Sequence, residues 1–281
     1  MGENMLKKIL LIINPLTLFL ILNFLSNSSS YDEFENLERL NYVNIGSSHA
    51  ARAFNYMGYS NSINLGFGSQ RMYYGLELLE AIERSLDGNS TVIIPISIFS
   101  FCGAYDGPKQ RYVGFLDRDQ LGMNYIEEIY HMHFPFVGID KNERRVYGQL
   151  EIGINYLDRK FSDDGLEIAQ RHLNDSYECG IIDQSILEKT RQFIERNSDK
   201  RIILIITPYY YTYWETILLE QVVADSVYST IYSLVNDFSI EFYDYSSDYR
   251  FLSSEIYFRD SNHLNSKGAT EFTRVFFEDI S

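Results

Sequence analysis

Two short segments near opposite ends of the chain carry residue types that could perform acyl transfer. Residues Val43–His49 have the pattern of a short apolar strand running into a Gly-Ser-Ser turn that ends at Ser48. Near the C-terminus, Asp260 and His263 stand three residues apart, just before an expected helix. A serine, a histidine and an aspartate form a nucleophilic triad, in which His removes the serine proton and Asp orients the imidazole. Ser48 alone fits a helix N-cap equally well, so the interpretation depends on both segments occurring together.

The two segments together resemble those of the SGNH (GDSL-type) hydrolase and acyltransferase superfamily. In that family the nucleophilic serine follows a Gly-Asp-Ser or Gly-Ser-Ser turn, and an Asp-x-x-His segment near the C-terminus supplies the acid and the base. The resemblance covers the chain from about Tyr42 to the end and implies Ser48 as nucleophile, Asp260 as acid and His263 as base. With Ser47 in place of the commoner Asp, the turn is similar to that of extracytoplasmic relatives that modify cell-surface polymers with acyl groups.

The oxyanion donors depart from the family pattern. The resemblance implies a backbone donor at Gly66, and the start of a helix at Ser48 supplies further unpaired amides. The family's Gly-x-Asn-Asp block is missing from the sequence, which reads Pro-Ile-Ser-Ile-Phe-Ser-Phe from Pro95, so Ser97 or Ser100 is the expected substitute donor. Losing one donor typically costs a factor of about 10²–10³ in rate. A slow hydrolase, an acyltransferase with a modified site and a non-catalytic member therefore all stay open.

Four further residues are candidates for substrate binding. His49 follows the expected nucleophile, and because neighbouring side chains diverge on a helix, we interpret it as a substrate-facing or packing residue rather than the base. Tyr209, Tyr210 and Tyr211 follow a strong apolar strand, where their rings could stack on sugar rings. The alternative is that these tyrosines fill the core.

The arrangement of the expected elements predicts the fold class. Strands are expected at 42–45, 62–65, 91–98, 201–207 and 239–243, and helices at 48–56, 70–86, 184–196, 214–236 and 266–278. Alternating strands and helices predict an α/β fold, a three-layer α/β/α sandwich around a central parallel sheet, which the resemblance specifies as the flavodoxin-like SGNH fold. Residues of about 100–175 break the pattern and are expected to be an inserted lid. The candidate residues follow strands, where parallel sheets form active sites.

The N-terminus has the features of an export signal. Lys7 and Lys8 precede an apolar run from Ile9 to Leu25, which a polar serine-rich stretch follows. This pattern predicts a signal peptide or membrane anchor over residues 1–30, with the catalytic domain at 31–281. The positive-inside rule then places the domain outside the cytoplasm, either membrane-anchored or secreted, in the periplasm or at the cell surface.

Composition argues against nucleic-acid binding and leaves open whether the two cysteines form a disulfide. The chain of 281 residues carries a net charge of −15, and Lys and Arg are not clustered, so nucleic acid is not an expected partner. No cofactor and no metal is expected. Cys102 and Cys179 could pair in an oxidising compartment, but the sequence does not decide whether they are close.

The sequence leads us to expect a serine-dependent ester hydrolase or O-acyltransferase that acts on acylated glycans or cell-surface polymers through an acyl-serine intermediate. An integral-membrane acyl-donor partner would suit the transferase. The alternatives are a small-ester or lipid esterase and a non-catalytic, membrane-tethered glycan-binding or assembly protein with the same fold.

Overall fold

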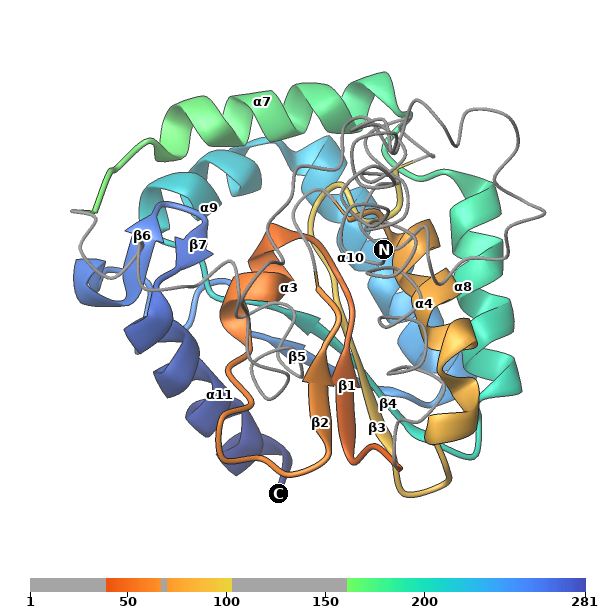
Figure 1. The fold of residues 1–281 in the computed structure, drawn as a ribbon. Coiled ribbons are helices and arrows are strands. Elements are labelled where there is room, and N and C mark those ends of the chain that lie inside the picture. The colour runs from red at the N-terminus through yellow and green to blue at the C-terminus, as the bar shows by residue number, and fades with distance from the viewer. Residues whose placement is uncertain (1–38, 67–69, 103–160) are drawn as a thin grey trace, which may run out of the picture. The chain divides into compact units, whose positions relative to one another are not determined.

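The computed structural model of the chain describes residues 39–66, 70–102 and 161–281, which contain a parallel five-stranded sheet (Figure 1). The strands lie in the order β2-β1-β3-β4-β5. Their bounds are Tyr42–Asn44 (β1), Ser62–Asn64 (β2), Thr91–Pro95 (β3), Arg201–Ile206 (β4) and Glu241–Asp244 (β5). The connections after β1 and β3 run to opposite edges of the sheet, so a topological switch point lies between these two strands. Ligands of open α/β sheets bind at such a point.

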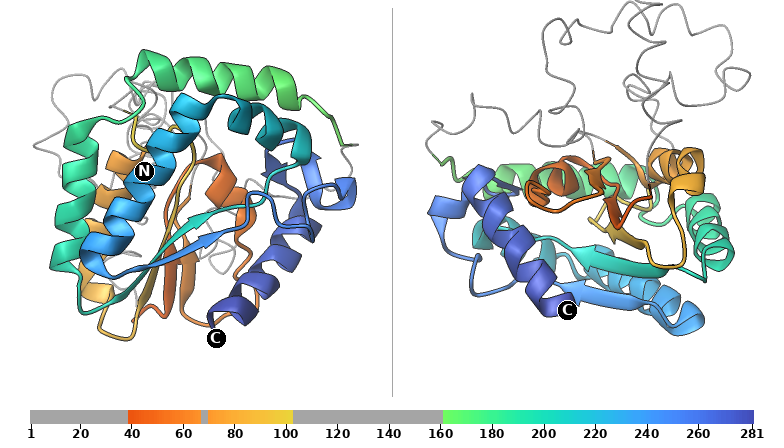
Figure 2. Two further views of the ribbon diagram at one scale, coloured as in Figure 1. Left: turned by 180° about the vertical axis from the view of Figure 1, so that it is seen from behind. Right: turned by 60° about the horizontal axis from the view of Figure 1, so that its bottom comes forward.

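Helices cover both faces of the sheet, which confirms the three-layer α/β/α sandwich (Figures 1 and 2). One face carries α3 and α11, and the other carries α4, α8 and α10. The helices are α3 (Ser48–Ala53), α4 (Met72–Ala81), α7 (Gly165–Glu178), α8 (Gln184–Arg196), α9 (Tyr211–Leu219), α10 (Gln221–Phe238) and α11 (Ser266–Ile280). Single 3₁₀ turns are η1 (Glu83–Ser85) and η4 (Glu255–Tyr257), and a two-stranded antiparallel pair is formed by β6 (Phe258–Asp260) and β7 (His263–Leu264).

Apolar strands and an aromatic helix face build the core. All five residues of β3 are buried, as are the last five of β4, because the central strands of a parallel sheet are covered on both faces. Between the sheet and the helices α3 and α11, Phe54, Phe272 and Phe276 lie with ring centroids 5.4–6.3 Å apart. This packing fixes α3, and with it the turn that carries Ser48, against the C-terminal helix.

The structure corrects several predicted boundaries. The helix expected over 214–236 is two helices, because Glu220 leaves the helical conformation (φ −92°, ψ 74°) between α9 and α10. The strand expected to reach Ile98 ends at Pro95, and the following residues form a turn. Within the insertion expected at 100–175, regular structure already resumes at Gly165 with α7, whereas residues 103–160 lie outside the described residues.

The proposed signal or anchor over residues 1–30 lies outside the described residues. Within 39–66, 70–102 and 161–281, none of the helices combines the length and the apolar character needed to span a bilayer.

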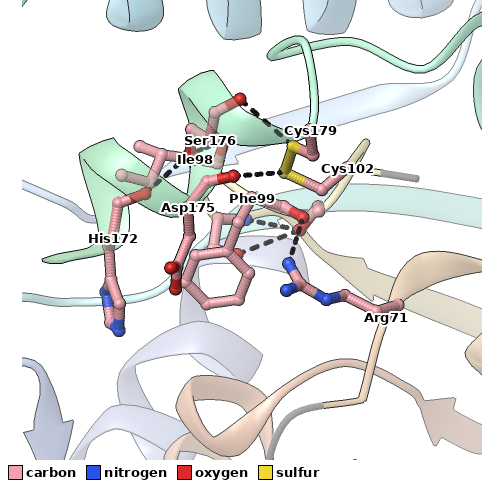
Figure 3. The surroundings of a disulfide bond; sticks show 10 residues. Arg71, Ile98, Phe99, Cys102, His172, Asp175, Ser176 and Cys179 are labelled. Carbon is pink, nitrogen blue, oxygen red and sulfur yellow. Dashed lines mark hydrogen bonds between the residues drawn. A yellow bond between two sulfur atoms is a disulfide. The ribbon is translucent and has the colours of Figure 1, made fainter. Parts of the chain in front are cut away.

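A disulfide joins Cys102, after the turn that follows β3, to Cys179 at the end of α7 (Figure 3). The half-cystines are 77 residues apart in the sequence. The Ser176 hydroxyl also donates to the Ile98 carbonyl at 3.2 Å, so α7 is attached to this turn twice.

Removing the disulfide should lower stability considerably. We expect the Cys102→Ser/Cys179→Ser double variant to lose about 2–5 kcal/mol of unfolding free energy, because the open chain regains the entropy of a long loop. Urea unfolding measures this loss. A reductant should destabilise the wild type to the same level and leave the double variant unchanged. Equal midpoints for the wild type and the double variant without reductant would contradict the prediction.

Candidate active site

A glycine with positive φ and a buried glutamine shape the turn that presents Ser48. Gly46 has φ +119°, and a Cβ placed there would lie 2.8 Å from the Ala50 Cβ, so only glycine fits without strain. The Gly46 N–H donates to Gln70 Oε1 at 2.6 Å, and Gln70 Nε2 donates to the Leu65 carbonyl at 3.0 Å. The β1–α3 turn and the end of β2 are thereby held together, and α3 begins at Ser48.

Ser48, His263 and Asp260 form one chain of hydrogen bonds. The Ser48 Oγ lies 2.7 Å from His263 Nε2, and His263 Nδ1 lies 2.8 Å from Asp260 Oδ1. With Nδ1–H donating to the carboxylate, Nε2 is free to accept the serine proton. Both distances are within hydrogen-bond reach of a nucleophile, its base and the group that orients the base. The structure therefore brings together the three residues predicted as a triad.

The partners of Asp260 keep its carboxylate ionised. Burial opposes ionisation, but the hydrogen bond from His263 and the charge of Arg259 outweigh it, so the pKa of Asp260 is lowered. Arg259 Nε lies 3.8 Å from Asp260 Oδ2. An ionised Asp260 is what stabilises an imidazolium as it forms on His263.

Backbone and side-chain bonds fix the segment between the acid and the base. The Ser261 hydroxyl donates to Asp164 Oδ1 at 2.8 Å, and the Tyr210 N–H donates to the Ser261 carbonyl at 2.9 Å. After β7, the Asn265 side chain accepts from the Gly268 N–H at 2.9 Å and caps α11. Asp260 and His263 thus lie in a short hairpin stabilised on both sides, not in an open loop before a helix.

The candidate oxyanion donors differ in their availability. The N-cap residue Ser47 makes no side-chain bond to the first turn of α3, so its hydroxyl does not occupy the amides of that turn. The Gly66 N–H already donates to Asn64 Oδ1 at 2.9 Å, and this amide can bind an oxyanion only if that bond is exchanged. Asn64 also donates to the Phe54 carbonyl at 3.0 Å, so it caps the end of α3.

Ser97 and Ser100 bond each other within the turn that follows β3. The Ser97 N–H donates to the Ser100 Oγ at 2.7 Å, and the two hydroxyl oxygens are 3.1 Å apart. Both side chains are buried. The bonds explain why the strand stops at this point, because the turn uses the donors that a longer strand would have paired. An oxyanion role for either hydroxyl stays a prediction.

The tyrosines expected to bind sugar are mostly core residues. Tyr209 is 1% exposed and Tyr210 is 5% exposed, whereas Tyr211 is 36% exposed. Tyr209 stacks on Trp214 with ring centroids 5.4 Å apart, and Tyr210 lies 5.7 Å from Phe258. The prediction that Tyr209 and Tyr210 present stacking faces to a sugar is wrong, because Trp214 of α9 covers Tyr209 and Phe258 of β6 packs against Tyr210.

His49 is likewise buried, at 4% exposure, and does not face solvent. Its ring centroid lies 5.2 Å from that of His263 and 5.6 Å from that of Phe99. Burial lowers the pKa of His49 well below its usual value, and the charge of Arg52 adds to this effect, so the His49 ring is neutral at physiological pH. The packing alternative for His49 agrees with this position.

Sequence reasoning did not single out three residues that lie beside the triad. Asn262 is 2% exposed and bonds His49. His172, on α7, bonds the Tyr213 hydroxyl through Nδ1 at 3.0 Å, and burial and the charge of Arg171 lower its pKa to about 3. No motif marks His172 or Tyr213, since both reach the site only because α7 packs on α9. The position of Asn262 inside the Asp-x-x-His segment was a usable signal.

No group of three or more His, Cys, Asp or Glu able to hold a metal occurs in the described parts of the chain.

No protein-family model matches the chain, and no curated protein matches it. A Streptococcus pneumonia protein provisionally described as a platelet activating factor is similar in structure, with 14% identity, TM-score 0.47, and coverage of 95% of this chain and 100% of that one. A gut microbial diltiazem-metabolizing enzyme is 13% identical, with a TM-score of 0.39, and the match covers 86% of this chain and 46% of that one, so the chain spans less than half of that protein. An extracellular lipase from Streptomyces rimosus is 10% identical, with a TM-score of 0.40, and the match covers 85% of this chain and 99% of that one. The function is therefore inferred from the side chains of the site.

Proposed function

We propose that the chain is a serine-dependent ester hydrolase or O-acyltransferase that works through an acyl-serine intermediate. The observation that carries this proposal is the chain of hydrogen bonds from Ser48 to His263 to Asp260, at 2.7 and 2.8 Å. Neither bond is needed to cap a helix or to pair a strand. A serine that is only an N-cap would bond backbone amides of its own helix rather than a histidine 215 positions away.

The proposed reaction has two halves. His263 Nε2 takes the proton of Ser48 as Oγ attacks the ester carbonyl, and the carbonyl π electrons move to its oxygen. The unpaired amides at the start of α3 are the proposed donors to the developing oxyanion. When the tetrahedral intermediate collapses, the C–O bond to the leaving alcohol breaks, and that alcohol takes the proton from His263. Water or a sugar hydroxyl then attacks the acyl-serine by the same steps in reverse.

For the substrate we propose acylated glycans or cell-surface polymers outside the cytoplasm. The support is the Gly-Ser-Ser turn, which resembles that of polymer-modifying relatives, and the apolar segment at Ile9–Leu25. The disulfide between Cys102 and Cys179 agrees with an oxidising compartment, where such bonds persist. An integral-membrane acyl donor is the proposed partner of a transferase.

Particular observations favour the two alternatives. Because Tyr209 and Tyr210 are buried, the described part of the site lacks the expected sugar platform, which favours a small-ester or lipid esterase. The occupied Gly66 amide and the missing Gly-x-Asn-Asp block favour a non-catalytic glycan-binding or assembly protein.

Labelling with a fluorophosphonate tests the proposal. We expect stoichiometric modification of Ser48, located by peptide mass spectrometry, because only a serine paired with a base is nucleophilic enough to react. Ser47→Ala is the matched control, since Ser47 lies in the same turn and makes no side-chain cap bond. It should label like the wild type. Failure of the folded wild type to label or to hydrolyse an aryl acetate would support the non-catalytic alternative. Faster acyl release from an acetylated glycan than from the aryl acetate would favour the glycan substrate over the small ester.

A further inference from the structure

Two consecutive residues on α3 bond two consecutive residues of the β6–β7 hairpin. Ser48 bonds His263, and next to this bond Asn262 Nδ2 lies 2.8 Å from His49 Nε2. The second bond is fully buried, with His49 4% and Asn262 2% exposed. His49, next to the nucleophile Ser48, is therefore bonded to Asn262, which is next to the base His263.

The bonds of His49 define its proton position. With Asn262 donating to Nε2, His49 carries its proton on Nδ1 and directs it at the Tyr209 hydroxyl, 3.2 Å away. The rings of His263, His172 and Tyr213 surround it at centroid distances of 5.2, 5.8 and 6.2 Å. Because both side chains are buried, breaking the bond would leave His49 Nε2 and the Asn262 amide without water to replace it, which is unfavourable.

We propose that the His49–Asn262 pair is a positioning device that sets the distance between Ser48 Oγ and His263 Nε2. The inference rests on the proposed function, because it assigns His49 and Asn262 a role in the same acyl transfer. Neither residue touches the reacting atoms through a bond described in the structure. His49 acts through the α3 backbone next to Ser48, and Asn262 acts through the backbone next to His263.

The pair is needed because the bond between serine and histidine does not last through the reaction. Once Ser48 is acylated, its Oγ has no proton to donate to His263, and the direct bond is gone. The His49–Asn262 bond involves no reacting atom, so it persists and keeps the base in place to activate the incoming water or alcohol. A displacement of about 1 Å at a catalytic group can cost about 10²-fold in rate.

Near-isosteric variants test the proposal. His49→Phe keeps a ring in the aromatic cluster but removes both nitrogens, and Asn262→Leu keeps the shape of the side chain but removes the amide. For each folded variant, the rate of fluorophosphonate labelling of Ser48 and the kcat and KM for an aryl acetate are compared with the wild type. We expect each single variant to lose about 10–100-fold in labelling rate and kcat, with little change in KM. The double variant should be no slower than the slower single variant, because both changes break the same bond.

Controls separate positioning from packing. Tyr213→Phe removes a hydroxyl in the same cluster that bonds His172 instead, and it should label at close to the wild-type rate. His49→Gln supplies an amide that can again bond Asn262 and should recover most of the rate, which also serves if His49→Phe does not fold. Losses that multiply in the double variant, full activity of a folded single variant, or a rise in KM alone would overturn the proposal. A wild type that does not label would overturn the proposed function instead, and the positioning role with it.

Discussion

Ser48→Ala should abolish acyl transfer while the protein stays folded. The Ser48 hydroxyl is the only atom removed, and its described side-chain bond is to His263. We expect the turnover of an aryl acetate to fall by about 10⁴–10⁶-fold, the usual cost of deleting the nucleophile of such a triad. The free energy of unfolding should fall by no more than the contribution of one partly buried hydrogen bond, about 0.5–1.5 kcal/mol.

Steady-state kinetics and urea unfolding on the same preparations measure both quantities. Ser47→Ala is the control, since it removes the same atom one residue earlier in the same turn. Wild-type turnover by folded Ser48→Ala would show that another residue is the nucleophile.

His263→Ala and Asp260→Asn should both impair catalysis, the histidine variant by more. Removing the base should cost about as much as removing the nucleophile, whereas changing the acid should cost about 10⁴-fold. In Asp260→Asn the amide oxygen is expected to face the Arg259 guanidinium, which lies 3.8 Å from Oδ2. The amide NH₂ would then donate to His263 Nδ1 and shift the ring proton to Nε2, where it blocks acceptance of the serine proton.

The control for this pair is Glu255→Gln, which removes one carboxylate charge from the exposed 3₁₀ turn just before the hairpin. Its kcat should match that of the wild type. Fluorophosphonate labelling rates, measured with kcat for all three variants, would locate the effect in the chemical step. Wild-type kcat in both His263→Ala and Asp260→Asn would mean that the C-terminal segment is structural.

The sequence carried the framework of the fold because strong local patterns mark its strands. The apolar runs before Pro95 and Pro208 are too continuous for a half-buried strand, so both were expected to be covered on two faces. Apolar residues at helical spacing lie between the strands, and a helix that connects two strands makes them parallel. The α/β/α sandwich followed from these two patterns. The ends of the elements did not follow from the pattern. Glu220 splits a predicted helix because α9 packs on α7 and α10 packs on α8, and the sequence does not show which neighbours a helix will have.

By itself, the sequence determined where the candidate residues lie along the chain: Ser48 just after the first strand, and Asp260 and His263 three residues apart just before the last helix. Only the tertiary structure decided what surrounds them. It paired Cys102 with Cys179, buried His49, Tyr209 and Tyr210, and engaged the Gly66 amide with Asn64. The physical reason is that a strand fixes where its last residue lies, whereas the exposure and bonding of a side chain depend on the elements that pack over it. Ser48 and His49, for example, are surrounded by side chains from α9 and the β6–β7 hairpin, which lie at least 160 residues later in the sequence.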